Sequence, residues 1–192
     1  MSPTTPIARA FTARGTRVVS IAEVDDAITA LSRGDRFEAL GLVAWPVSAE
    51  APFDIEPGAF AARSSTLLLA PFRALQLFAG ATPKGLIFAV THLGGGLGFS
   101  NLEQGSAEHG GWAGLLKAIR REQEGMEVAL LDTSAGTAPE QVCAALLAEL
   151  DAGCPRLEVG LLRSKRVRLA IPLRPADDFT GGAERLPRTW IV

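Results

Sequence analysis

The sequence predicts an α/β domain with a mostly parallel sheet flanked by helices and a hairpin-like pair of strands near its C-terminal end. Segments with strand character alternate along the chain with segments of helical periodicity, as in parallel sheets. The strand segments are also continuous apolar runs, such as residues 85–90, which is typical of strands that helices cover on both faces. The two last strands, 157–162 and 166–171, are separated by only a few polar residues, which favours a hairpin.

The chain begins with a polar segment, residues 1–15, that we expect to be a flexible leader. A short buried strand is predicted at 17–21. Residues 22–32 carry acidic residues in their first turn and an apolar stripe, so they are expected to form a helix that ends at Gly34.

The middle of the chain continues the alternation. Residues 39–44 form the next apolar strand, and 47–58, which contain three prolines, are expected to be a loop. Residues 61–79 have helical spacing with Pro71 inside them, so the helix either kinks at Pro71 or starts there.

The strand at 85–90 is followed by a glycine loop and by a helix over about 110–124. The apolar stripe of that helix is Trp112, Leu115, Leu116 and Ile119. Gly111 and Gly114 are expected to allow close packing.

A further strand is predicted at 127–131. The run Thr137-Ala-Pro-Glu140 has the pattern of a capping box with proline in the first turn, and its helix is expected to reach Leu150. Residues 174–188 are rich in proline and glycine and are expected to be a linker before a strand at 189–192.

Composition sets limits on function. The chain has 192 residues, of which 47% are hydrophobic and 21% charged, so one globular domain is expected. The net charge of −2 gives no electrostatic case for binding nucleic acid, and no apolar run is long enough for a membrane span. The two cysteines, Cys143 and Cys154, and the two histidines match no disulfide framework or zinc site, so a cytoplasmic protein without a metal is expected.

Few residues are candidates for chemistry. The loop Gly94–Gly98 follows a strand, but it lacks the G-x-G-x-x-G spacing of a phosphate-binding turn, so a structural or vestigial role is favoured. His92 and His109 have no partner for a catalytic triad that the sequence identifies, and Cys143 lies on the apolar side of a helix. The basic cluster Arg163, Lys165, Arg166 and Arg168 is either a solvated turn, which is the favoured reading, or an anionic docking site.

The order of elements along the chain resembles the short-chain dehydrogenase/reductase superfamily from that family's third strand onward. Residues 38–46 resemble its fourth strand, and Gly85–Gly98 resembles its fifth, whose end carries the catalytic serine. Thr91 and His92 stand at that serine's place, and Gly105 and His109 stand where the catalytic tyrosine and lysine would fall. The chain contains no tyrosine, and no T-G-x-x-x-G-x-G turn precedes Arg17, so the resemblance implies a scaffold without the catalytic or cofactor-binding residues.

A narrower resemblance is to the structural subdomain of a type I polyketide synthase ketoreductase, particularly the variant in polyunsaturated fatty acid synthase-like systems. The segments that carry it are 110–117, 128–132, 144–149 and 158–167. That subdomain has a truncated Rossmann-like fold and precedes the catalytic subdomain. The resemblance therefore implies a leader at 1–15, a structural subdomain at 16–173, and a linker with the first strand of a missing catalytic subdomain at 174–192.

On this reading the chain supports an NADPH-dependent β-ketoacyl reductase and supplies no catalytic or cofactor-binding residue itself. The implied partners are the adjacent catalytic subdomain and possible other synthase domains, with the acyl carrier protein among them. The chain alone would not be an enzyme, whereas its parent multienzyme would be one. Two alternatives stay open, namely a reductase-like pseudoenzyme that acts as an adaptor and an enzyme for small substrates that uses His92 or His109.

Overall fold

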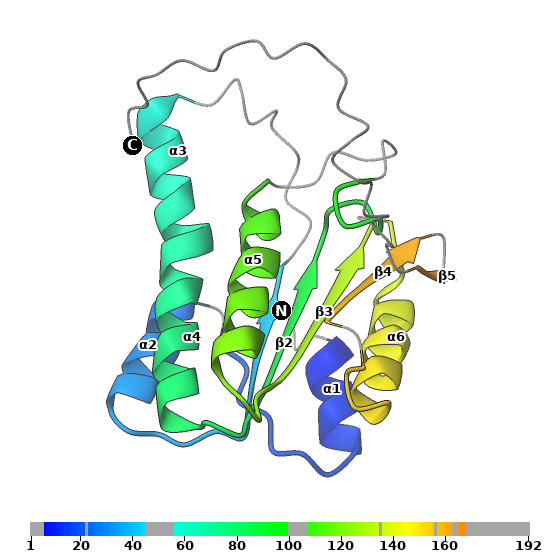
Figure 1. The fold of residues 1–192 in the computed structure, drawn as a ribbon, viewed down its shortest axis with the longest axis horizontal. Coiled ribbons are helices and arrows are strands. Elements are labelled where there is room, and N and C mark those ends of the chain that lie inside the picture. Colours follow the sequence, from blue (N-terminus) through cyan, green and yellow to red (C-terminus); the bar gives the residue numbers. More distant parts are fainter. Residues whose placement is uncertain are drawn as a thin grey trace, which may run out of the picture.

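A five-stranded sheet in the order β1-β2-β3-β4-β5 forms the centre of the molecule (Figure 1). The computed structural model describes residues 6–21, 23–44, 56–99, 107–134, 136–155, 157–162 and 165–167. The strands are β1 (Ala39–Val43), β2 (Leu86–Thr91), β3 (Glu127–Thr133), β4 (Glu158–Leu162) and β5 (Lys165–Val167). The helical segments are α1 (Pro6–Ala13), α2 (Val24–Ser32), α3 (Pro57–Ser64), the π-helix η1 (Ser65–Leu69), α4 (Ala70–Ala81), α5 (Ala107–Glu122) and α6 (Pro139–Asp151).

The predicted fold class is confirmed. Strands β1 to β4 pair in parallel, and β5 returns antiparallel to β4 through the pairs Gly160–Val167 and Leu162–Lys165. Five of the six residues of β2 are buried, as its continuous apolar pattern predicted. Because the strands are parallel, their carboxyl ends meet at one edge of the sheet, the upper edge in Figure 1.

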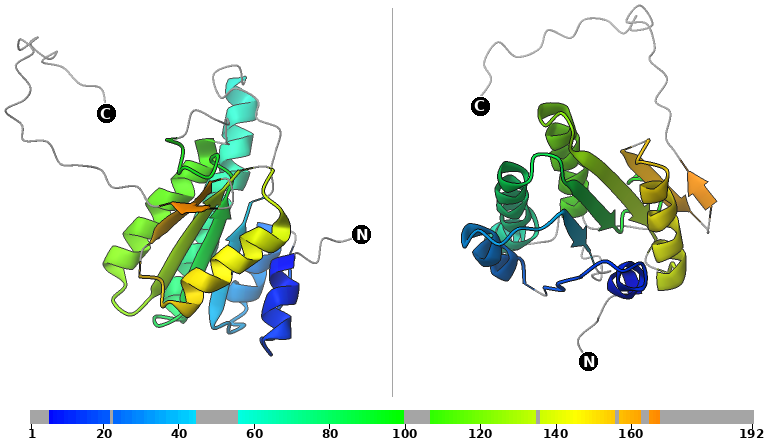
Figure 2. Two further views of the ribbon diagram at one scale, coloured as in Figure 1. Left: turned by 90° about the vertical axis from the view of Figure 1, so that its right-hand side faces the viewer. Right: turned by 90° about the horizontal axis from the view of Figure 1, so that it is seen from below.

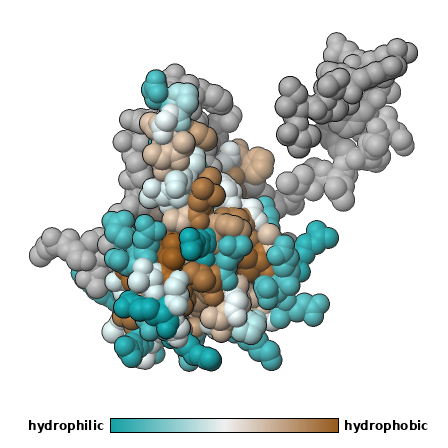
Figure 3. Space-filling model, turned by 90° about the vertical axis from the view of Figure 1, so that its left-hand side faces the viewer, coloured by the Kyte–Doolittle hydropathy of each residue, from teal (hydrophilic) through white to brown (hydrophobic). Residues whose placement is uncertain are grey.

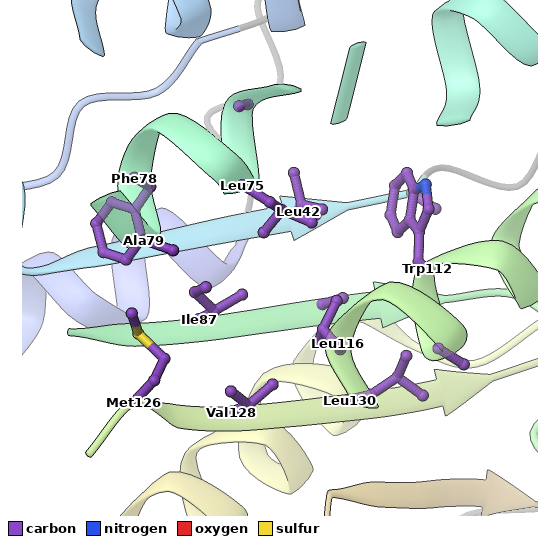
Figure 4. Close-up of a cluster of buried hydrophobic side chains, with 14 of the residues drawn as sticks. Leu42, Leu75, Phe78, Ala79, Ile87, Trp112, Leu116, Met126, Val128 and Leu130 are labelled. Carbon is purple, nitrogen blue, oxygen red and sulfur yellow. The ribbon is translucent and has the colours of Figure 1, made fainter. Parts of the chain in front are cut away.

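Helices cover the sheet in two layers, which lie on opposite sides of the strands in the right-hand view of Figure 2. Helices α4 and α5 form one layer over a core that includes Leu75, Ile87 and Leu116, each fully buried (Figure 4). Helix α2 packs on α4. Helices α1 and α6 cover the other face, where the core contains Leu131 and Leu146.

Helix α5 has the phase that its sequence predicts. Trp112 and Leu116 are buried, and Leu115 and Ile119 pack at the margin of the same core. Gly111 packs closely on Leu68, because a β-carbon there would meet a terminal methyl group of Leu68, which would have to move. The same expectation for Gly114 is wrong, since a β-carbon there would meet open space.

Residues 57–81 form one helical stretch in which the π-helix η1 lies just before Pro71. Proline has no amide hydrogen, so the carbonyl of Leu67 lacks the donor that position 71 would supply in an α-helix. The indole nitrogen of Trp112 donates to this carbonyl instead, at 2.6 Å. The predicted helix start at Pro71 is wrong, because the helical stretch begins at Pro57, inside the expected loop at 47–58. Near Pro71 the helix type changes instead, and α5 satisfies the carbonyl that Pro71 leaves without a donor.

The N-terminal predictions are partly wrong. The expected leader contains helix α1, whose Ile7 and Ala8 are buried because α1 packs on α6. Arg14 also forms an ion pair with Asp151 of α6, at 2.7 Å. Residues 17–21 are not a strand, and Val19 is 52% exposed, because no neighbouring strand receives them.

Two C-terminal details also differ. Helix α6 has Pro139 in its first turn as expected, but its N-cap is Ala138 and makes no side-chain capping bond, so the capping box is wrong. The hydroxyl of Thr137 contacts that of Ser134 instead. Lys165 and Arg166 lie in β5 rather than in a turn. The predicted strand end at 168–171, the linker and the strand at 189–192 lie outside the described residues.

Within the described sheet β1 is an edge strand, and some of its backbone groups have no partner among the described residues. The bonds from Leu86 to Glu38 and from Ala44 to Val90 show that even-numbered residues of this segment point toward β2. The N–H and C=O of a parallel-strand residue point to the same side, so those of Ala39, Gly41 and Val43 point outward. No hydrogen bond from the described part of the chain reaches them. These three residues also line a groove that is bordered by α1, residues 14–21 and α2.

Other surface features are less organised. Hydrophobic side chains gather between hydrophilic ones on the side of the molecule seen in Figure 3. Leu69 and Phe72 are 62% and 38% exposed. Within the described ranges, no helix is both long and apolar enough to cross a membrane.

Candidate functional site

Three buried polar side chains lie together where β2 and β3 end at the carboxyl edge of the sheet, namely Thr91, Asp132 and Thr133. Asp132, near the end of β3, is fully buried. It lies beside the turn formed by residues 93–98, which follows β2. This is the edge at which open α/β sheets bind their ligands.

Asp132 binds the glycine loop through its own carboxylate. The Leu93 amide donates to Oδ1 at 2.6 Å, and the Leu97 amide donates to Oδ2 at 2.8 Å. The Thr91 hydroxyl donates to Oδ1 at 2.9 Å, and the Gly95 amide also donates to the carboxylate. The loop amides that could otherwise bind a phosphate therefore donate to the Asp132 carboxylate.

Electrostatics at Asp132 balance two opposing effects. Burial raises the pKa of Asp132, because a carboxylate without water is disfavoured. Hydrogen bonds from the loop amides and from Thr91 act in the opposite direction. The loop is held close to the sheet as well: a β-carbon on Gly95, where φ is +74°, would collide with the Leu161 carbonyl.

His92 joins the ends of three neighbouring strands. Its Nε2 lies 2.9 Å from the carbonyl oxygen of Ala44, which follows β1, so Nε2 carries the hydrogen. Its Nδ1 lies 2.8 Å from the hydroxyl of Thr133 in β3, which is 3.1 Å from the Thr91 carbonyl oxygen. Both ring nitrogens of His92 are thus in hydrogen-bond contact with groups of the protein itself.

His109 lies in the first turns of α5 and is only 2% exposed. Burial lowers its pKa to about 4, with smaller contributions from the charges of His92 and Arg63, while Glu108 opposes them. Its ring lies 5.3 Å from that of Trp112. Glu108 forms a buried ion pair with Arg63 of α3 at 2.7 Å. At neutral pH His109 is therefore an uncharged, enclosed ring.

The structure brings some of the predicted residues together and separates others. Thr91 and His92 lie at the carboxyl edge, whereas Gly105 lies outside the described residues. Arg166 of β5 forms an ion pair with the buried Glu149 of α6 at 2.9 Å, so one residue of the basic cluster stabilises the contact with α6. Arg163 and Arg168 lie outside the described residues. Cys143 and Cys154 are buried, and burial raises the pKa of both thiols.

Sequence reasoning missed Asp132 and Thr133 as site residues. The available signal was two polar residues at the carboxyl end of a buried parallel strand. In the described segments, no group of histidine, cysteine or carboxylate side chains has the arrangement of a metal site. The hydrogen bonds that Asp132 accepts from Thr91, Leu93 and Leu97 orient and rigidify the loop.

Comparison with known proteins is informative for the fold. No family model and no curated protein matches the sequence. A bulky-bulky ketone specific alcohol dehydrogenase from Comamonas testosteroni has a TM-score of 0.61 at 15% identity, covering 79% of this chain and 68% of its own. BdcA in complex with NADPH has a TM-score of 0.54 at 16% identity, with coverages of 79% and 75%.

A metagenomic short-chain oxidoreductase in complex with NADP has a TM-score of 0.52 at 21% identity, covering 73% of this chain and 71% of its own. At such identities the likeness concerns the fold alone. The fold is therefore similar to that of short-chain dehydrogenases, which confirms the predicted Rossmann-like class.

Proposed function

We propose that this chain is a non-catalytic structural subdomain that supports the NADPH-dependent β-ketoacyl reductase of a polyketide or fatty-acid synthase. The observation that carries the proposal is the binding of the glycine-loop amides by Asp132. A loop whose amides donate to the chain's own carboxylate is suited to rigidity and does not offer those amides to a ligand. The chain also has no tyrosine to act as a proton donor.

The open edge of β1 supports a role beside a partner. Unpaired strand edges in stable proteins are usually covered, paired or protected by charge. Here Ala39 and Gly41 are exposed, and the groove beside them is lined by Phe88 and Leu86. The adjacent catalytic subdomain would cover this edge, and its activity would then depend on the contact.

Reconstitution from separate chains tests the proposal. A catalytic subdomain of a polyunsaturated fatty acid synthase-like ketoreductase is expressed alone, and NADPH oxidation is followed with a β-ketoacyl thioester. We expect no turnover by this chain alone and faster turnover when both chains are present. Turnover by this chain alone, or a catalytic subdomain indifferent to it, would contradict the proposal. Binding without a change in rate would favour the adaptor alternative.

Ala39→Pro is the matched variant for the edge. Its missing amide hydrogen points outward, so the β1–β2 hydrogen bonds are retained and the urea midpoint should stay nearly unchanged. The stimulation of the catalytic subdomain should decrease. An equal decrease for Ser65→Ala, an exposed position in η1, would show that the effect does not come from the β1 edge.

A second candidate is an enzyme for small substrates. The observation in its favour is that His92 and His109 lie close enough at the carboxyl edge for their charges to interact. It predicts an activity that is lost in His92→Asn or His109→Asn while the urea midpoint is retained.

A further inference from the structure

The free edge of β1 lies in a groove between the sheet, α1, residues 14–21 and α2. Ala39, Gly41 and Val43, whose N–H and C=O groups point outward, line this groove, which we call the β1 groove. Free strand edges are commonly protected by a proline or a charged residue, and β1 contains neither. An extended polypeptide carries donors and acceptors with the same two-residue repeat, so it is the chemical class that matches this edge.

Apolar groups border the β1 groove. A β-carbon on Gly41 would collide with the ring of Phe88, so this ring lies against the backbone of β1. The ring of Phe11 in α1 stacks on that of Phe88 with a centroid distance of 5.5 Å. Three further apolar residues, which are between 37% and 52% exposed, also line the groove, namely Val18, Val19 and Ile21. A strand bound here therefore needs apolar side chains, as the covered strands of parallel sheets have.

The charges around the β1 groove balance one another. Arg14 forms an ion pair with Asp151 at 2.7 Å. The other charged residues that line the described groove are three arginines and three acids, namely Arg17, Arg33, Arg36, Asp26, Asp35 and Glu38. The groove therefore has no net charge that would attract a phosphate or a strongly charged peptide. Its electrostatics suit an uncharged segment.

We propose that the β1 groove binds one extended, uncharged and apolar segment of the partner reductase subdomain, which pairs with β1 as a sixth strand of the sheet. This inference rests on the proposed function and specifies how the two proteins meet. Pairing satisfies the outward groups of Ala39, Gly41 and Val43, and the side chains of the segment cover Phe11 and Val19. A second copy of the chain cannot offer its own β1 as this segment, because that strand lies inside the same groove.

Amide hydrogen exchange during the reconstitution described above tests the inserted strand. We expect the amides of Ala39, Gly41 and Val43 to slow about fivefold when the catalytic subdomain is bound, the factor that corresponds to one hydrogen bond of about 1 kcal/mol. Faster turnover without slower exchange would overturn the inserted strand and leave the proposed function standing. Slower exchange without faster turnover would support the inserted strand and count against the proposed function.

A peptide tests the groove without the catalytic subdomain. The probe has five alternating valine and isoleucine residues flanked by lysines, and its control has a proline at the central position, which cannot continue a strand. We expect saturable slowing of the same three amides with the first peptide alone. Equal slowing by both peptides, or slowing by neither, would overturn the proposal.

Val19→Ser tests the apolar lining of the groove. It should weaken binding of the valine–isoleucine peptide and leave the urea midpoint nearly unchanged, because Val19 is 52% exposed. Leu69→Ser is the matched control, since Leu69 is 62% exposed and does not line the groove. Unchanged binding by Val19→Ser, or equal weakening by both variants, would contradict binding in the β1 groove.

Discussion

Asp132 is the residue on which the glycine loop depends. Asp132→Ala would leave the buried Leu93 amide and the half-buried Leu97 amide without an acceptor, and an unpaired buried group costs about 1–3 kcal/mol. We expect the free energy of unfolding in urea to fall by about 3–5 kcal/mol. Asp132→Asn keeps the shape but turns one N–H toward an amide donor, so its loss should be smaller. Equal stability of Asp132→Ala and the unaltered protein would refute the assigned role.

His109 gives the protein a specific dependence on pH. Its pKa is lowered from 6.5 to about 4 in the folded state, so the unfolded chain binds a proton more readily. The stabilisation from neutral His109 is complete above pH 6.5 and is lost as the pH falls toward 4. The loss amounts to about 3 kcal/mol at 1.36 kcal/mol per pH unit.

The measurement is urea unfolding of the unaltered protein and of His109→Asn at several pH values between about 7 and about 4. This range covers the window between the pKa values of the unfolded and folded states. The variant should lose less stability than the unaltered protein over this range. Parallel curves would mean that His109 is not buried in its neutral form.

At the scale of elements, the contact between η1 and α5 substitutes for a missing backbone bond. Trp112→Phe keeps an aromatic side chain, though a smaller one, and removes the donor to the Leu67 carbonyl; the lost hydrogen bond should cost about 1–2 kcal/mol. Pro71→Ala restores an amide hydrogen at the position that normally bonds residue 67. Trp112→Phe should therefore cost less in the Pro71→Ala background. Additive losses in a double-mutant cycle would contradict this compensation.

At the scale of the whole molecule, the chain should bind NADPH poorly. A dinucleotide pyrophosphate is held by free amides of a glycine-rich turn at a helix N-terminus, and no T-G-x-x-x-G-x-G turn precedes Arg17. The loop at residues 93–98 offers no substitute, because its amides donate to Asp132. A calorimetric titration of the unaltered protein with NADPH should give no saturable heat. Micromolar binding would overturn the assignment of the loop as structural.

Much of this architecture could be predicted from the sequence, because parallel strands and amphipathic helices leave strong apolar periodicity. The strands at 39–43 and 86–91 and the phase of α5 are examples. Helix α1 could not be predicted in the same way, because its stability comes from packing on α6 and from the pair Arg14–Asp151. The apolar run at 17–21 was predicted to be a strand but is not one. High β-propensity alone does not form a strand, because a strand also needs a neighbour to pair with.

The site was harder to predict than the fold. A histidine in a sequence suggests a catalytic residue, but in the structure the His92 ring forms hydrogen bonds with the Ala44 carbonyl and the Thr133 hydroxyl. The hydrogen bonds between Asp132 and the loop join residues that are 35 to 39 positions apart in the sequence. Such a contact depends on the pairing of β2 with β3, which local pattern does not specify.

The alternating backbone of β1 has a consequence for amide hydrogen exchange. Leu42 and Ala44 are bonded toward β2 and should exchange slowly with deuterium, whereas Ala39, Gly41 and Val43 face outward and should exchange quickly. A period-two pattern of protection along five consecutive residues would thus report which side of the strand is free. If a partner strand docks there, the three fast amides should slow while their neighbours change little.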